Sequence, residues 1–139
     1  MTTNNAINAP IKYFEPFSPT ISGTSAAGVG TYTTQVGYWS GIGNFIYVQL
    51  KITWTAHTGT GDMTVTDLPF VCRNISGYDP ELILNIEDVL LPPTTVCLFG
   101  HMTTGTSTVV LETIRSLGNN VPISMEAAGT LHLSGVYLK

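Results

Sequence analysis

Residues 30–70 read GTYTTQVGYWSGIGNFIYVQLKITWTAHTGTGDMTVTDLPF, and in this stretch apolar and polar side chains alternate while glycines gather where the alternation breaks. Between residues 45 and 55 every second side chain is apolar, which is the period of a strand with one buried face. The predicted buried face consists of Ile46, Val48, Leu50, Ile52 and Trp54. The stretch therefore predicts three consecutive antiparallel strands, over 31–39, 45–55 and 63–68, joined by turns at 41–44 and 57–62.

The same two-residue pattern resumes after residue 93 and continues through the rest of the chain. It predicts four further strands, over 95–102, 108–114, 122–125 and 130–138. About eight short strands separated by turns are typical of an all-β fold, an antiparallel β-sandwich of the jelly-roll type. Residues 1–20 contain three prolines and little periodicity, which predicts an extended lead-in to a single domain over 21–139.

Residues 79–90 allow two interpretations. Asp79 followed by Pro80 is typical of the start of a helix, and the apolar residues that follow fit a helical period. Leu82, Leu84 and Ile86 also alternate as they would in a strand. We favour the strand because the neighbouring segments are all predicted strands.

The surface is predicted to be polar but weakly charged. Only 10% of the residues are charged, against about 25% in an average protein, and 5 basic residues stand against 9 acidic ones. Five basic residues are too few to neutralise a nucleic acid backbone, so nucleic acid is not an expected partner. A small soluble monomer depends on charge for its solubility, and the low charge indicates that part of the surface is buried between subunits.

The sequence shows no signal for export or for membrane insertion. No apolar run reaches the roughly 18 residues of a membrane span, and MTTNNAINAP at the N-terminus lacks the basic start and apolar core of a signal peptide. The chain is therefore expected to be made in a cytoplasm. Because disulfides are rare there, Cys72 and Cys97 are predicted to be free buried thiols rather than a pair.

No arrangement of residues indicates catalysis, a metal or a cofactor. His57, His101 and His132 have no metal-ligand spacing with one another or with the cysteines, and the sequence contains no HExxH, CxxC or GxSxG motif. The simplest interpretation of His57 is an exposed polar residue of its turn. We therefore expect a binding protein without enzyme activity and without a cofactor.

The block over 30–70 resembles a known family. The motifs that carry the resemblance are Thr31-Tyr32-Thr33, Gln35-Val36-Gly37, Ile42-Gly43-Asn44, Thr58-Gly59-Thr60-Gly61, Leu68-Pro69-Phe70 and, near the end, Ser134-Gly135-Val136-Tyr137. They are similar to the pattern of the C-terminal head domains of bacteriophage tail fibres and related virion fibre proteins. Trp39 stands where the family usually has tyrosine, and residues 71–93 match poorly. The resemblance implies a compact jelly roll similar to tumour necrosis factor and C1q domains, assembled as a homotrimer.

The resemblance also implies a function: a non-enzymatic virion protein that binds a host cell-surface glycan or protein through turns at one end. The residues expected to contact this receptor are His57, Thr58, Asp62, Arg73, Asn74, Tyr78 and Asp79. Tyr78 has a second, preferred interpretation as the anchor of its own loop. The residues expected at the trimer contact are Phe45, Tyr47, Gln49, His132 and Val136.

Two other hypotheses remain open. The first is a structural decoration or fibre-cap protein, which would bind other virion proteins in assembly and have no receptor of its own. The second is an enzyme that depolymerises surface polysaccharide, which would need two carboxylates about 5 to 10 Å apart in a cleft. The enzyme ranks last because spikes of this kind usually place catalysis on a long β-helix, which 139 residues cannot supply alongside such a head.

Overall fold

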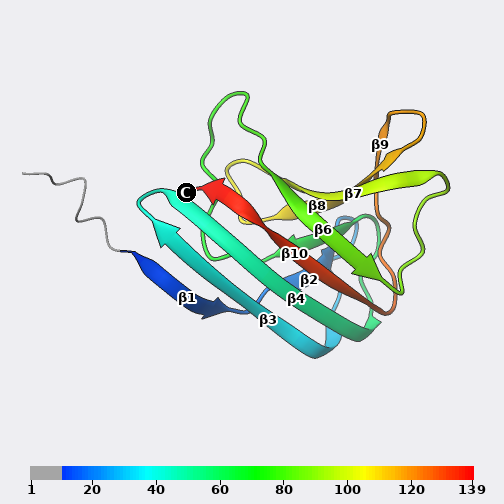
Figure 1. Cartoon of the computed structure of the whole chain (residues 1–139). Helices are drawn as coiled ribbons and strands as arrows, with labels where there is room; N and C mark the ends of the chain where they lie inside the picture. The colour runs from blue at the N-terminus through cyan, green and yellow to red at the C-terminus, as the bar shows by residue number, and fades with distance from the viewer. Residues whose placement is uncertain (1–10) are drawn as a thin grey trace, which may run out of the picture.

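A computed structural model of the chain describes residues 11–139 as an all-β domain, which confirms the predicted antiparallel sandwich. The first ten residues of the expected lead-in lie outside the described residues. The strands of the described part are β1 Lys12–Phe17, β2 Thr20–Gly23, β3 Gly30–Ile42, β4 Phe45–His57, β5 Met63–Thr66, β6 Glu81–Glu87, β7 Thr95–Met102, β8 Val109–Arg115, β9 Asn120–Pro122 and β10 Gly129–Leu138 (Figure 1).

All the strands pair antiparallel in the order β1-β3-β4-β10-β6-β7-β8-β5-β2, with β9 beside β8. The sheet curls so that β2, at one end of this order, meets β3 and β4 near the other. The Tyr32 hydroxyl accepts a hydrogen bond from the Ile21 N–H (3.2 Å), and the Gln35 amide donates to the Pro19 carbonyl (2.9 Å). Side chains of β3 therefore satisfy backbone groups along the free edge of β2, which is how this fold protects an exposed strand edge.

The core lies between the two halves of the curled sheet. Along β4 buried and exposed side chains alternate, and the five residues predicted to be buried are at most 3% exposed. The inner faces of β6 and β10 complete this part of the core, and Leu84 of β6 lies opposite Leu133 of β10. This pairing makes Glu81–Glu87 a strand, so the helical interpretation of residues 79–90 is wrong.

The chain path differs in detail from expectation at two places. The second half of the expected extended lead-in lies along the domain as a strand that was not predicted, because Lys12–Phe17 pairs with β3. A β-bulge interrupts the two-residue alternation of side chains in this strand. The register shifts between Lys12 and Glu15, and Phe14 has a positive φ of 47°. The strand predicted over 122–125 is also displaced. Only Pro122 belongs to β9, because the backbone beyond it turns to bond with residues 61–63.

The turn between β3 and β4 has two residues, Gly43 and Asn44. Gly43 has a φ of 58°, and glycine with a positive φ at the first central position is typical of a type II′ hairpin turn. This turn matches the right-handed twist of the strands and holds the register in which Ile42 lies opposite Phe45. That register decides which side chains share the outer face.

Both cysteines are free thiols, as predicted, but they differ in exposure. Cys72 is buried, and Cys97 on β7 is exposed, so the expectation that both are buried is wrong for Cys97. Burial, with a smaller effect of the negative charge of Asp79, raises the pKa of the Cys72 thiol.

We predict that Tyr137→Phe destabilises the domain. The Tyr137 side chain is fully buried, and its hydroxyl donates to the Phe70 carbonyl (3.0 Å) and accepts from the Phe70 N–H (3.2 Å). Removing the hydroxyl leaves both backbone groups without this partner, which is expected to lower the free energy of unfolding by about 2 kcal/mol. Urea unfolding measures the change. Tyr38→Phe, at an exposed tyrosine outside the expected trimer contact, is the control, and an equal effect of the two substitutions would contradict the prediction.

Candidate interaction surface

The two turns expected to contact a receptor lie at opposite ends of the sandwich. One turn follows the end of β4, whereas the other is held to the end of β10 by a hydrogen bond from the Arg73 N–H to the Leu138 carbonyl (2.8 Å). Because Leu138 lies opposite Phe45 in the antiparallel pair of β10 and β4, these turns are separated by the 13 residues of β4, about 40 Å. The seven expected receptor residues therefore form no single site.

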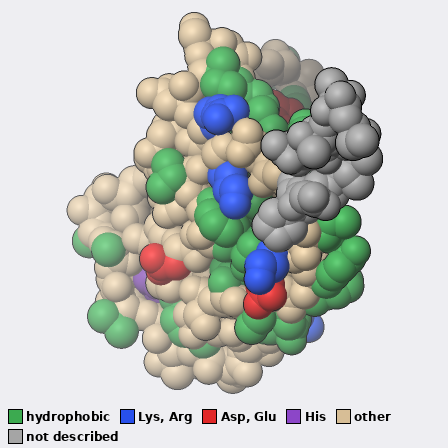
Figure 2. Space-filling view, turned by 90° about the vertical axis from the view of Figure 1, so that its left-hand side faces the viewer, with side chains coloured by type: hydrophobic (Ala, Val, Ile, Leu, Met, Phe, Trp, Pro, Cys, Tyr) green, Lys and Arg blue, Asp and Glu red, His purple; other side chains and the backbone are tan. Residues whose placement is uncertain are grey.

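The described ends of the chain mark one of these ends, which we call the proximal end. Lys12 pairs with Gly41, and the Lys139 N–H donates to the Asn44 carbonyl (2.9 Å), so both lie beside the β3–β4 turn. Figure 1 shows them at the left, with the turns that follow β4 and β6 at the right. Figure 2 looks onto the proximal end, where Lys and Arg side chains form a column beside hydrophobic groups. The opposite end, which carries the turn after His57, is the distal end.

At the distal end, His57 holds its own turn. The Gly59 N–H donates to Nδ1 (2.9 Å), so the other ring nitrogen, Nε2, carries the proton and donates to the Ile21 carbonyl (3.0 Å). The ring is half-buried, unlike the exposed loop residue expected from the sequence. Thr58 is exposed and accepts a hydrogen bond from the Val29 N–H, and Asp62 is half-buried. The turn is therefore preorganised against residues 24–29.

At the proximal end, the segment over 71–79 mixes exposed side chains with one anchor. Arg73, Asn74 and Asp79 are exposed. The Tyr78 ring packs against the core, and its hydroxyl accepts a hydrogen bond from the Leu138 N–H (2.8 Å). This contact confirms the interpretation of Tyr78 as the anchor of its own loop.

The five residues expected at the trimer contact lie together on one surface, the outer face of β3, β4, β10 and β6. Strand pairing arranges this face in rows about 7 Å apart. From the proximal end, the rows are Ile42–Phe45–Leu138, Ser40–Tyr47–Val136, Tyr38–Gln49–Ser134–Ile83 and Val36–Lys51–His132–Asn85. The sequence predicted which residues of β4 and β10 face outward, whereas their neighbours on β3 and β6 follow from long-range pairing.

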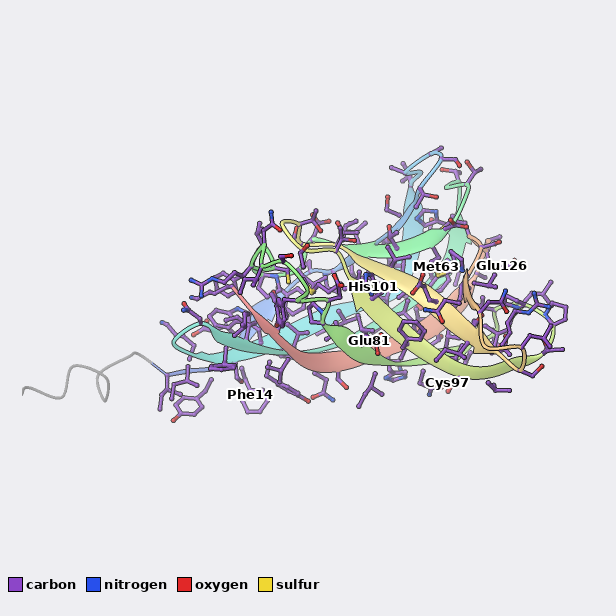
Figure 3. All side chains as sticks on the ribbon, turned by 90° about the horizontal axis from the view of Figure 1, so that it is seen from above. Phe14, Met63, Glu81, Cys97, His101 and Glu126 are labelled. Atoms are coloured by element: carbon purple, nitrogen blue, oxygen red, sulfur yellow. The ribbon has the colours of Figure 1, made fainter. Side chains whose placement is uncertain are left out.

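The proximal rows of this face are apolar and are not covered by any part of residues 11–139, and together with Ile11 and Tyr13 they form what we call the apolar patch. It consists of Ile11, Tyr13, Ile42, Phe45, Tyr47 and Val136. All six side chains are more than 40% exposed. They line an open groove of about 390 Å³. Beside it, the strained bulge turns the Phe14 ring into solvent, where Figure 3 shows it projecting from the ribbon. Exposed apolar surface of this extent is typical of an interface between proteins.

The next two rows form a polar hollow. Two adjoining concavities, of about 380 and 100 Å³, share Gln49, Leu50 and His132. The polar side chains around them are Tyr38, Gln49, Lys51, Asn85, His132 and Ser134. Lys51 lies opposite His132, and His132 lies opposite Asn85, so these three side chains stand side by side across three strands. Sequence analysis missed the hollow because no local pattern links residues 38, 51, 85 and 132.

Within residues 11–139, no group of three His, Cys, Asp or Glu side chains is arranged to hold a metal ion. No helix in the same range could cross a membrane by its length and apolar character. No family model matches the sequence, and comparison with curated proteins and with solved structures gave no match.

We predict that His57→Phe destabilises the distal end. The substitution keeps a ring of similar shape but removes the hydrogen bonds to the Gly59 N–H and the Ile21 carbonyl, at an expected loss of about 2 kcal/mol in the free energy of unfolding. Thermal unfolding and hydrogen exchange at residues 57–62 measure the effect. Thr60→Ala, at an exposed position of the same turn, is the control. Unchanged exchange in the His57 variant would contradict the anchoring role.

Proposed function

We propose that the chain is the head of a homotrimeric virion fibre, which binds a receptor on the host cell and catalyses no reaction. The observation that carries the proposal is the apolar patch. In a chain with only 10% charged residues, six large apolar side chains stand uncovered on one sheet face. A second copy of the chain is the partner that explains both the patch and the low charge, because cyclic assembly lets every copy cover its neighbour.

The positions of the chain ends support a head of this kind. Lys12 and Lys139 both lie beside the β3–β4 turn, so the rest of a fibre would attach at the proximal end. The distal end would then point away from the virion, with the turns over 24–29, 57–62 and 88–94 outermost. Of the expected receptor residues, His57, Thr58 and Asp62 lie at the distal end. Arg73, Asn74 and Asp79 lie at the proximal end, near the rest of the fibre, and are less suited to contact a cell.

The solution mass of the full chain tests the assembly. By light scattering coupled to size exclusion, the wild-type chain is expected to have about three times the 14.9 kDa of one chain. Tyr47→Glu and Val136→Asp each place a carboxylate in the centre of the apolar patch, where burial against a neighbouring copy would strip its water. Each variant is expected to be a folded monomer.

Thr55→Glu is the matched control, because it adds the same charge on the outer face of the same strand, toward the distal end. It is expected to keep the wild-type mass. A monomeric wild-type chain would overturn the proposed trimer, and so would trimers of both patch variants. Trimers that bind purified virion proteins but no host cells would favour the decoration or fibre-cap hypothesis instead.

A further inference from the structure

We infer that the polar hollow is a binding site for an acidic saccharide, with a carboxylate held between Lys51 and His132. The inference rests on the proposed function, since it names the chemistry of the receptor, but it moves the receptor contact from the turns to the sheet. It also takes Gln49 and His132, which were expected at the trimer contact, as ligand contacts. The hollow starts one row beyond Tyr47 and Val136, so a second copy that covers only the apolar patch would leave it open.

The charge of the hollow selects an anion. The chain has 9 acidic and only 5 basic residues, yet no acidic residue lines either concavity. Lys51 and His132 lie directly opposite each other on β4 and β10. The Lys51 ammonium carries a positive charge, and the His132 ring offers an N–H donor beside it. A carboxylate between them would pair with the ammonium and accept a hydrogen bond from each side chain.

The remaining groups fit the rest of a sugar. Gln49 and Asn85 each offer an amide that can donate to one hydroxyl and accept from another. The Tyr38 ring, 44% exposed, offers a flat apolar surface to the C–H groups of a pyranose. Among the described residues, the chain's own side-chain hydrogen bonds are formed elsewhere, by groups such as Gln35, His57 and Tyr78. The polar groups of the hollow are therefore free to bind a ligand.

The size of the hollow favours a small ligand over a large anionic polymer. Its larger concavity, of about 380 Å³, lies within the usual range of small-molecule sites, roughly 300 to 1,000 Å³. One lysine beside one histidine is enough for a single carboxylate but too little positive charge for the phosphates of a nucleic acid. A sugar unit with one carboxylate matches the volume, the charge and the amide groups together.

Binding of the full chain to an array of bacterial surface oligosaccharides tests the inference. Each acidic oligosaccharide is paired with its carboxyl-reduced, neutral counterpart. We expect at least one acidic member to bind, its counterpart to bind about tenfold more weakly or worse, and binding to weaken as NaCl is raised. Lys51→Gln and the double variant K51Q/H132Q are expected to lose about tenfold or more in affinity. Lys139→Gln, the same substitution at an exposed lysine of the proximal end, is expected to lose nothing.

Three results would overturn the inference. The first is that no acidic oligosaccharide binds the wild-type chain more tightly than it binds K51Q/H132Q. Another is competition by inorganic phosphate alone at the affinity of the sugars, which would mean a simple anion site. The third is a change of solution mass in K51Q/H132Q, which would place the hollow inside the subunit contact. Because the patch variants report on the trimer separately, failure of the saccharide site leaves the proposed trimer intact.

Discussion

The alternation of side chains along β4 is the constraint on which the rest of the structure depends. β4 lies between β3 and β10 and is paired along most of its length with both. Its inner face buries five apolar side chains, which together contribute on the order of 10 kcal/mol of hydrophobic free energy, similar to the net stability of a typical domain. A slip of one residue would turn Lys51 into the core and Trp54 into water.

The same alternation makes the outer face. Once Ile46 and Trp54 point inward, Phe45, Tyr47 and Lys51 must point outward, whatever their chemistry. The core therefore dictates where the surface residues stand, while their identity stays free to vary. This face carries two different surfaces, the apolar patch toward the chain ends and the polar hollow beside it. Because the side chains of both point outward, each surface can be changed without altering the core.

The sequence predicted the strands where the two-residue period was intact and failed where backbone geometry broke it. From Gly30 onward most strands were anticipated within a few residues, and the choice of strand over helix for β6 followed from its neighbours. β1 was missed because Pro16 and the bulge at Phe14 interrupt the period. β9 was displaced because the chain beyond Pro122 bonds to residues 61–63 rather than to β8 alone.

Local patterns also located part of the candidate site. They showed that Phe45, Tyr47 and Gln49 share an outward face, but not that Tyr38 and Asn85 stand beside them, since register between distant strands leaves no local signal. For the same reason the sequence could not show that the two turns expected to contact a receptor lie about 40 Å apart.

The neighbouring positions of Lys12 and Lys139 have a mechanical consequence. A domain whose ends emerge side by side is held at a single point, so a pulling force on both ends acts on the β3–β4 turn and the last residues of β10. Little of that force is carried through the sheet to the turn after His57. Such a domain can also be inserted into a surface loop of another protein with little strain on either. In such an insertion the distal end would be a separate surface, held away from the host protein and little affected by strain in that protein.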